Sequence, residues 1–142
     1  MYPFYLELEL VKPVSEYLKN KGYTLKNEVR IGFCRADLVG FKEGKVVSVE
    51  LKLRDYKRAI IQAKNYQLGS DYAYIACPLA RSYNILKKAK HKLEENGIGL
   101  LVVNEKSTKV KEVLKPKKSK KKFASITIDE IERKKKKRGK FY

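Results

Sequence analysis

Two carboxylates and a lysine are the side chains in this 142-residue sequence whose types and spacing best suit chemistry. Glu50 and Lys52 stand two positions apart in a mostly apolar run, 45–53, and a strand there places both side chains on one face. The turn signal at 42–44 predicts a hairpin whose register sets Asp37 directly opposite Glu50. Like charges on directly opposed residues destabilise a strand pair. We therefore expect a cation between the two carboxylates, and oxygen ligands suit Mg²⁺ or Mn²⁺.

A third acid is expected from an amphipathic helix over 6–21. Glu7 projects from the middle of its apolar stripe, whereas Glu9 and Glu16 project from the opposite side. A carboxylate on a buried face needs a partner or a metal. Pro13 leaves an alternative open, because a proline can kink or restart the helix and return Glu7 to solvent. Which of the three glutamates joins the site stays open.

The composition excludes several other kinds of site. His91 is the one histidine, and the two cysteines, Cys34 and Cys77, lie far apart. A zinc finger, a disulfide framework and a histidine-based triad are therefore ruled out. The sequence shows no run of eighteen apolar residues and no secretory signal, so we expect a cytoplasmic protein with no membrane segment.

Positive charge is concentrated towards the C-terminal end. The formal net charge is +18, of which residues 1–103 carry +7 and residues 104–142 carry +11. A field of this sign attracts polyanions, of which nucleic acid is the commonest. The alternative is a surface rich in lysine that serves solubility or thermal stability.

The hydrophobic pattern predicts an α/β fold, with a mixed sheet and helices on both of its faces. We divide the chain into one domain, 1–115, and a basic tail, 116–142, in which a capping-box spacing favours a short helix from residue 127. After the helix at 6–21, the expected elements are strands at 23–30, 35–41, 45–53, 71–77, 98–103 and 110–114, and helices at 55–68 and 82–96.

These motifs resemble the PD-(D/E)XK nuclease superfamily, whose restriction-endonuclease-like core has the order αβββαβ. That family places an aspartate on the second strand, here Asp37, and Asp/Glu-x-Lys on the third, here Glu50 and Lys52. RecB-like and archaeal members add Gln-x-x-x-Tyr on the next helix, and Gln62 and Tyr66 match it. The resemblance covers about residues 5–103, and Ala36 stands where the family often has proline.

The resemblance implies a metal-dependent endonuclease that hydrolyses phosphodiester bonds in DNA, with Mg²⁺ as cofactor and Mn²⁺ as a substitute. The alternative is a non-catalytic nucleic-acid-binding module of the same fold. RNA as the substrate and a homodimer as the assembly both stay open. The catalytic residues would be Glu7, Asp37, Glu50, Lys52 and Gln62, and the metal ligands Asp37, Glu50 and the backbone carbonyl of Leu51. The nucleic-acid-binding residues would be Arg35, Arg54, Tyr66, Lys117, Lys118, Lys120, Lys121, Lys122, Lys134, Lys135, Lys136, Lys137 and Arg138.

Overall fold

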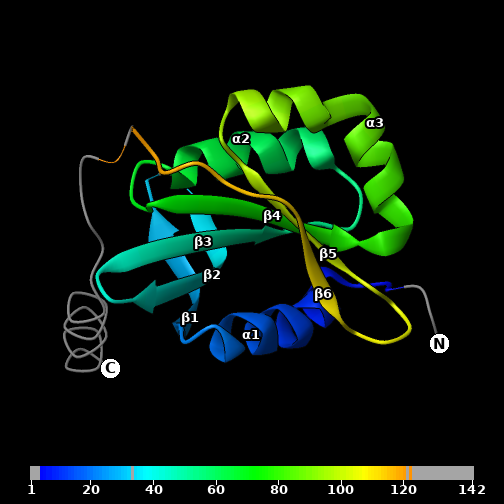
Figure 1. Cartoon of the computed structure of the whole chain (residues 1–142), viewed down its shortest axis with the longest axis horizontal. Helices are drawn as coiled ribbons and strands as arrows, with labels where there is room; N and C mark the ends of the chain where they lie inside the picture. Colours follow the sequence, from blue (N-terminus) through cyan, green and yellow to red (C-terminus); the bar gives the residue numbers. More distant parts are fainter. Residues whose placement is uncertain (1–3, 33, 121, 123–142) are drawn as a thin grey trace, which may run out of the picture.

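The fold is a mixed six-stranded sheet with helices on both faces, as the hydrophobic pattern predicts. A computed structural model describes residues 4–32, 34–120 and 122. The strands lie in the sheet in their order along the chain (Figure 1). The elements are η1 (Glu7–Leu10), α1 (Val11–Asn20), β1 (Thr24–Ile31), β2 (Cys34–Lys42), β3 (Lys45–Leu51), α2 (Tyr56–Tyr66), β4 (Tyr72–Pro78), α3 (Leu79–Glu95), β5 (Gly99–Val103) and β6 (Val110–Leu114).

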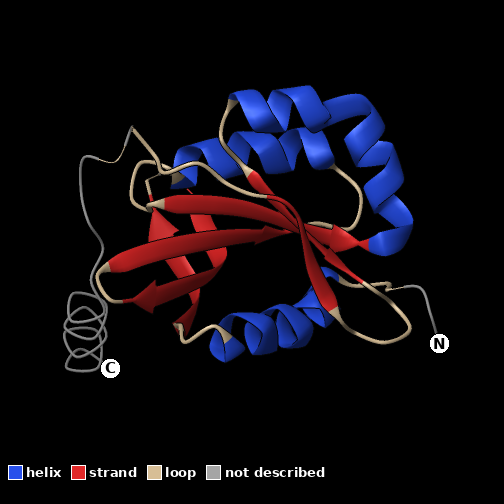
Figure 2. Ribbon diagram, viewed as in Figure 1, coloured by secondary structure: helices blue, strands red, loops and turns tan. Residues whose placement is uncertain are grey.

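Apolar residues bury both faces of the sheet. Helix α1 covers one face, and α2 and α3 cover the other (Figure 2). On the α1 side, Leu10, Val14 and Leu18 pack against apolar residues of β2, β3 and β5. On the opposite side, residues of α2 and α3 pack against β4 and β5. Strands β3, β4 and β5 run parallel and are buried from both sides, as the continuous apolar runs of β4 and β5 require.

The register of the β2–β3 hairpin confirms the prediction from its turn. Lys42 pairs with Lys45 and Leu38 pairs with Val49, so the same register continues towards Asp37 and Glu50. The regular pairing ends at Leu38 and Val49. Asp37 is therefore the first residue of β2 beyond the paired region. Its side chain, rather than its backbone, bonds the backbone of β3, at Leu51.

The first helix begins later than the apolar stripe predicts. Residues Glu7–Leu10 form a 3₁₀ turn, and the α-helix starts at Val11. Pro13 lies in the first turn of α1, where backbone N–H groups have no helical partner. Of the two effects expected of this proline, a kink or a restart, the structure shows the restart, because the 3₁₀ turn gives way to the α-helix just before Pro13.

Other boundaries differ by a few residues. Strand β3 ends at Leu51 rather than at 53, and α3 starts at Leu79 rather than at 82. Helix α3 follows Pro78 directly, and the Ser82 hydroxyl donates to the Leu79 carbonyl within the first turn. The helix expected from residue 127 lies outside the described residues.

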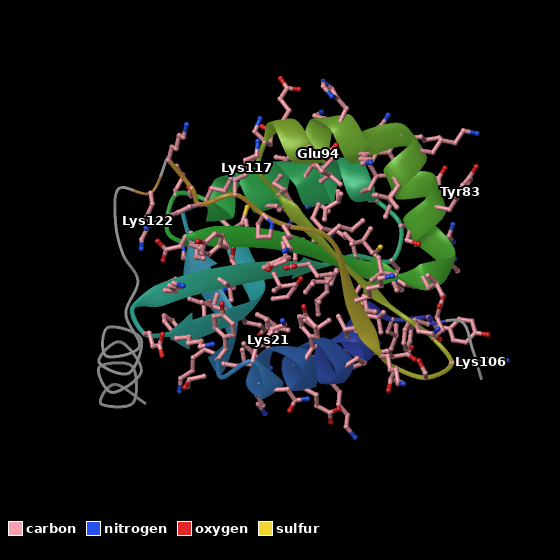
Figure 3. The ribbon with its side chains drawn as sticks, viewed as in Figure 1. Lys21, Tyr83, Glu94, Lys106, Lys117 and Lys122 are labelled. Carbon is pink, nitrogen blue, oxygen red and sulfur yellow. The ribbon has the colours of Figure 1, made fainter. Side chains whose placement is uncertain are left out.

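The chain beyond β6 stays on the domain as far as Lys122. The Lys117 and Ser119 amides donate to the carbonyls of Gly97 and Asp71, at 3.0 and 2.7 Å. The Lys122 ammonium lies 2.9 Å from an Asp71 carboxylate oxygen. Figure 3 labels Lys117 and Lys122 along this segment. We call residues 115–120 and 122 the strap. Among the described residues, no helix is long and apolar enough to cross a membrane.

Candidate active site at the end of strands β2 and β3

Glu50 is the most enclosed acid of the candidate site. It is the penultimate residue of β3, and only 3% of its surface is exposed. The Tyr66 hydroxyl, from the last turn of α2, donates to Glu50 Oε1 at 2.6 Å. Lys52 Nζ lies 3.4 Å from Glu50 Oε2. The carboxylate is thus held between a neutral donor and a cation, as a buried charge requires.

Asp37 lies beside Glu50 and is held by the backbone of β3. Its Oδ2 accepts a hydrogen bond from the Leu51 amide at 2.8 Å. Backbone pairing of β2 with β3 ends at Leu38 and Val49, and beyond that point this side-chain bond connects the two strands. The expected meeting of two carboxylates from neighbouring strands is therefore present in the structure.

Burial is the main influence on the acidity of this pair. Loss of solvent raises the pKa of Glu50 to about 7, and the nearby Asp37 adds to the rise, while Tyr66 and Lys52 oppose it. Loss of solvent also raises the pKa of Asp37, against the Leu51 amide, Glu50 and Lys52. Burial, and then the bond to Glu50, raise the pKa of Tyr66, so it stays a hydrogen-bond donor. Near neutral pH Glu50 therefore retains protons that an isolated glutamate would lose, and the pKa of Asp37 is shifted in the same direction.

Glu7 reaches the same end of the sheet by a different route from the one predicted. It lies in η1 and is exposed, so the alternative in which Glu7 returns to solvent is observed, and projection from a buried helix face is not. Its Oε2 accepts a hydrogen bond from the Leu53 amide at 3.2 Å, and its charge contributes to the raised pKa of Asp37. Glu9 instead bonds the amides of Tyr5 and Leu6, and Glu16 is exposed on α1. Of these three glutamates, Glu7 lies beside the site.

Gln62 and Tyr66 have different roles in the structure. Gln62 Oε1 is buried and has no hydrogen-bond partner among the described residues. Tyr66 is fully buried, and its hydroxyl proton is shared between two acceptors, Glu50 Oε1 and, at 2.8 Å, the Arg35 carbonyl. The expectation that Tyr66 contacts nucleic acid is therefore wrong, because its side chain is buried. Tyr66 instead positions Glu50 and the Arg35 backbone. The sequence pairs Tyr66 with Gln62 in one motif but carries no signal for the bond of Tyr66 to Glu50.

The basic residues expected at nucleic acid are spread over the surface. Arg35 and Arg54 are exposed close to the carboxylates in sequence, and Lys117, Lys118 and Lys120 are exposed on the strap. Lys122 is engaged with the buried Asp71, so the expectation that its ammonium is available for nucleic acid is wrong in this conformation. The remaining expected residues, Lys121, Lys134, Lys135, Lys136, Lys137 and Arg138, lie outside the described residues.

Comparison with known proteins supports the fold class. No family model matches the chain, and no curated protein matches its sequence. Among solved structures, a protein of unknown function from Silicibacter pomeroyi has a TM-score of 0.60 and 18% identity, over 78% of this chain and 71% of the other. An XisH family protein from Nostoc punctiforme has a TM-score of 0.54 and 20% identity, over 72% and 94% of the two chains. An fdxN element excision controlling factor protein from Anabaena variabilis has the same TM-score and identity, over 75% and 96%.

These likenesses, at such low identity, establish the fold alone. The architecture is restriction-endonuclease-like, which is also the fold of the XisH neighbours. The fold expected from the sequence is therefore confirmed. Fold does not fix function, so an activity has to be argued from the site.

Proposed function

We propose that the protein is a metal-dependent endonuclease that hydrolyses phosphodiester bonds in DNA. The observation that carries the proposal is the convergence of Asp37 and Glu50, from two strands, beside the cation of Lys52. Bringing two carboxylates together in a poorly solvated place is unfavourable for folding. Such an arrangement suits a function that uses both acids at once.

The donor set fits Mg²⁺, with Mn²⁺ as a substitute. The ligands would be Asp37, Glu50 and the Leu51 carbonyl, all of them oxygen donors. The described residues contain no group of three or more His, Cys, Asp or Glu side chains suited to a metal. Mg²⁺ commonly takes only one or two carboxylates and keeps water and substrate phosphate for the remaining positions. A bound divalent cation would polarise the phosphoryl oxygens and favour deprotonation of water.

The surrounding side chains have roles that follow from their positions. Lys52, which already lies against Glu50 Oε2, would orient the attacking water and offset negative charge that develops on the phosphate. Glu7 would orient solvent at the edge of the site. The unpartnered Gln62 Oε1 is an acceptor directed into buried space, and Gln62 would help to anchor the cleaved strand.

A cleavage assay with Mg²⁺ or Mn²⁺ tests this proposal over duplex, branched and single-stranded DNA, and over RNA. We expect metal-dependent cleavage that is lost in both Asp37→Ala and Glu50→Ala, with each variant still folded. Glu43→Ala is the matched control, because Glu43 belongs to another Glu-x-Lys triplet in the exposed β2–β3 turn. Full activity of Asp37→Ala would refute the site.

A second candidate is a nucleic-acid-binding module of the same fold without catalysis. The observation that favours it is that Tyr66 and Lys52 already satisfy Glu50, and the Leu51 amide binds Asp37, without a metal. This module would bind DNA equally well in EDTA. It would show no calorimetric signal for Mg²⁺ and no cleavage of any substrate in the panel.

A further inference from the structure

Two arginines face each other across the β1–β2 pair. Arg30 of β1 is directly opposite Arg35 of β2. Directly opposed side chains leave a strand pair on the same face, with β-carbons about 4.5–5.5 Å apart, and like charges there are destabilising. Both arginines are exposed, and neither guanidinium has an ion pair or hydrogen bond with any described residue. The pair therefore has unused capacity for an anion.

The arginines lie close in the chain to the candidate metal ligand Asp37. Arg35 and Asp37 are two residues apart in β2, so their α-carbons lie about 7 Å apart along the strand. The opposite face of this strand pair is buried, because Val29, Ile31 and Ala36 pack in a cluster with Tyr66. The buried face thus directs both arginines outward, into solvent.

The end of α2 fixes the backbone beneath both arginines. The Tyr66 hydroxyl bonds the Arg35 carbonyl at 2.8 Å and Glu50 Oε1 at 2.6 Å. The neighbouring Asn65 donates from Nδ2 to the Ile31 carbonyl, at 2.6 Å, directly after Arg30. The base of the arginine pair is therefore held in a set position relative to Glu50, and such preorganisation lowers the cost of binding.

We propose that Arg30 and Arg35 together bind one phosphodiester group of a nucleic-acid backbone. Two guanidinium forks at this spacing match the oxygens of a phosphate, which arginine binds in a bidentate manner. The bound group is the neighbour of the phosphate presented to Asp37 and Glu50, an assignment that rests on the proposed function. Arg30 thereby becomes a substrate-positioning residue that the motifs do not identify.

Binding to duplex DNA in EDTA tests the subsite without any catalysis. The double variant Arg30→Ala/Arg35→Ala is compared with Lys88→Ala/Lys92→Ala, which removes two exposed charges from α3. We expect the arginine variant to bind about tenfold more weakly, with the log–log salt slope reduced by about 0.9, the value for one shared phosphate. The lysine control should stay close to wild type. An equal loss of DNA affinity in both double variants would overturn the proposal. A fall of about 1.8 in the salt slope of the arginine variant would also overturn it, because that value means that the two arginines bind separate phosphates.

Cleavage in Mg²⁺ distinguishes failure of the subsite from failure of the proposed function. We expect the arginine double variant to raise KM about tenfold with kcat nearly unchanged, and Arg35→Lys to fall between wild type and Arg35→Ala. If the wild type cuts DNA and the arginine variant matches the lysine control, the subsite is wrong and the nuclease stands. If the EDTA result holds but the wild type cuts nothing, the nuclease is wrong and the subsite stands. Circular dichroism, with the single variants Arg30→Gln and Arg35→Gln, excludes misfolding as the cause.

Discussion

Ionisation of Glu50 should lower the folding stability of the metal-free protein in a pH-dependent way. Its pKa of about 7 in the folded state lies above the ordinary value of 4.5. The contribution of Glu50 to the free energy of unfolding is therefore fully present below about pH 4.5. It is lost as the pH rises through 7, because Glu50 ionises more easily in the unfolded chain than in the folded one. For this almost fully buried group, the loss is on the order of 3 kcal/mol.

Replacing Glu50 with Gln should remove that loss. In EDTA we expect Glu50→Gln to gain stability relative to wild type as the pH rises from 4.5 to 8, by up to about 3 kcal/mol. Urea unfolding at a series of pH values measures this difference, with Glu43→Gln as the control for the loss of one negative charge. A difference between Glu50→Gln and wild type that is constant with pH would show that Glu50 ionises normally.

Lys52 should be separable from the metal ligands. Its ammonium lies 3.4 Å from Glu50 Oε2 and opposes a second cation there. We expect Lys52→Met to slow cleavage by about 10²–10³-fold, the range for loss of one group that stabilises developing charge. Calorimetry should show Mg²⁺ affinity that is unchanged or tighter. Lys45→Met, at the β2–β3 turn, is the matched control. Loss of metal affinity together with activity would mean that Lys52 holds the acids in place.

At the scale of elements, α2 connects both halves of the site through one hydroxyl. Tyr66 bonds Glu50 from β3 and the Arg35 carbonyl from β2. Its aromatic ring belongs to the core that also contains Val39 and Val46. The end of α2 thus sets the separation of the two strands at the point where their hydrogen-bonded ladder stops.

The variant Tyr66→Phe tests that connection while keeping the ring. Loss of the hydroxyl leaves a buried carboxylate and a carbonyl short of a donor, and we expect a cost of about 1–3 kcal/mol. Because the Tyr66 hydroxyl lowers the pKa of Glu50, the pH midpoint of Mg²⁺ binding should also move upward. Tyr83→Phe, at an exposed position on α3 labelled in Figure 3, is the control. An unchanged midpoint would show that Tyr66 does not tune Glu50.

At the scale of the whole molecule, the site and the strap lie at opposite ends of the sheet. Strands β3 and β4 run parallel, and Glu50 pairs near the end of β3, whereas Asp71 immediately precedes β4. Lys122 reaches Asp71, which is only 6% exposed. Burial alone would raise the pKa of Asp71, but the Val46 amide and Lys122 hold it below the ordinary value. The strap therefore completes the far end of the domain.

Two truncations separate the strap from the residues beyond it. Ending the chain after Lys122 should keep the fold and metal-dependent cleavage at saturating substrate, and should flatten the salt slope of DNA binding, because basic residues are lost. Ending the chain after Lys115 should lower the free energy of unfolding by about a further 3 kcal/mol, because the buried Asp71 then loses its ion-pair partner Lys122.

Thermal unfolding followed by circular dichroism compares the two truncations, and Lys122→Ala in the full chain isolates the ion pair. Equal stability of both truncations would show that the strap contributes nothing to the domain. A folded chain ending at Lys122 that binds metal but cuts nothing would place part of the active site beyond Lys122.

The sequence by itself determined the order of the elements and the register of the β2–β3 hairpin. Apolar periodicity marks the elements, and the short turn at 42–44 fixes which residues oppose each other. The register then places Asp37 near Glu50, with Lys52 on the same face. These are local properties, which sequence spacing expresses directly.

Only the tertiary structure decided how distant elements complete the site. The hydrogen bond from Tyr66 to Glu50, the approach of Glu7 to Leu53 and the contact of Lys122 with Asp71 join residues from 16 to 51 positions apart. Such contacts depend on how packed layers place side chains in space, and neither spacing nor periodicity along the chain records that placement.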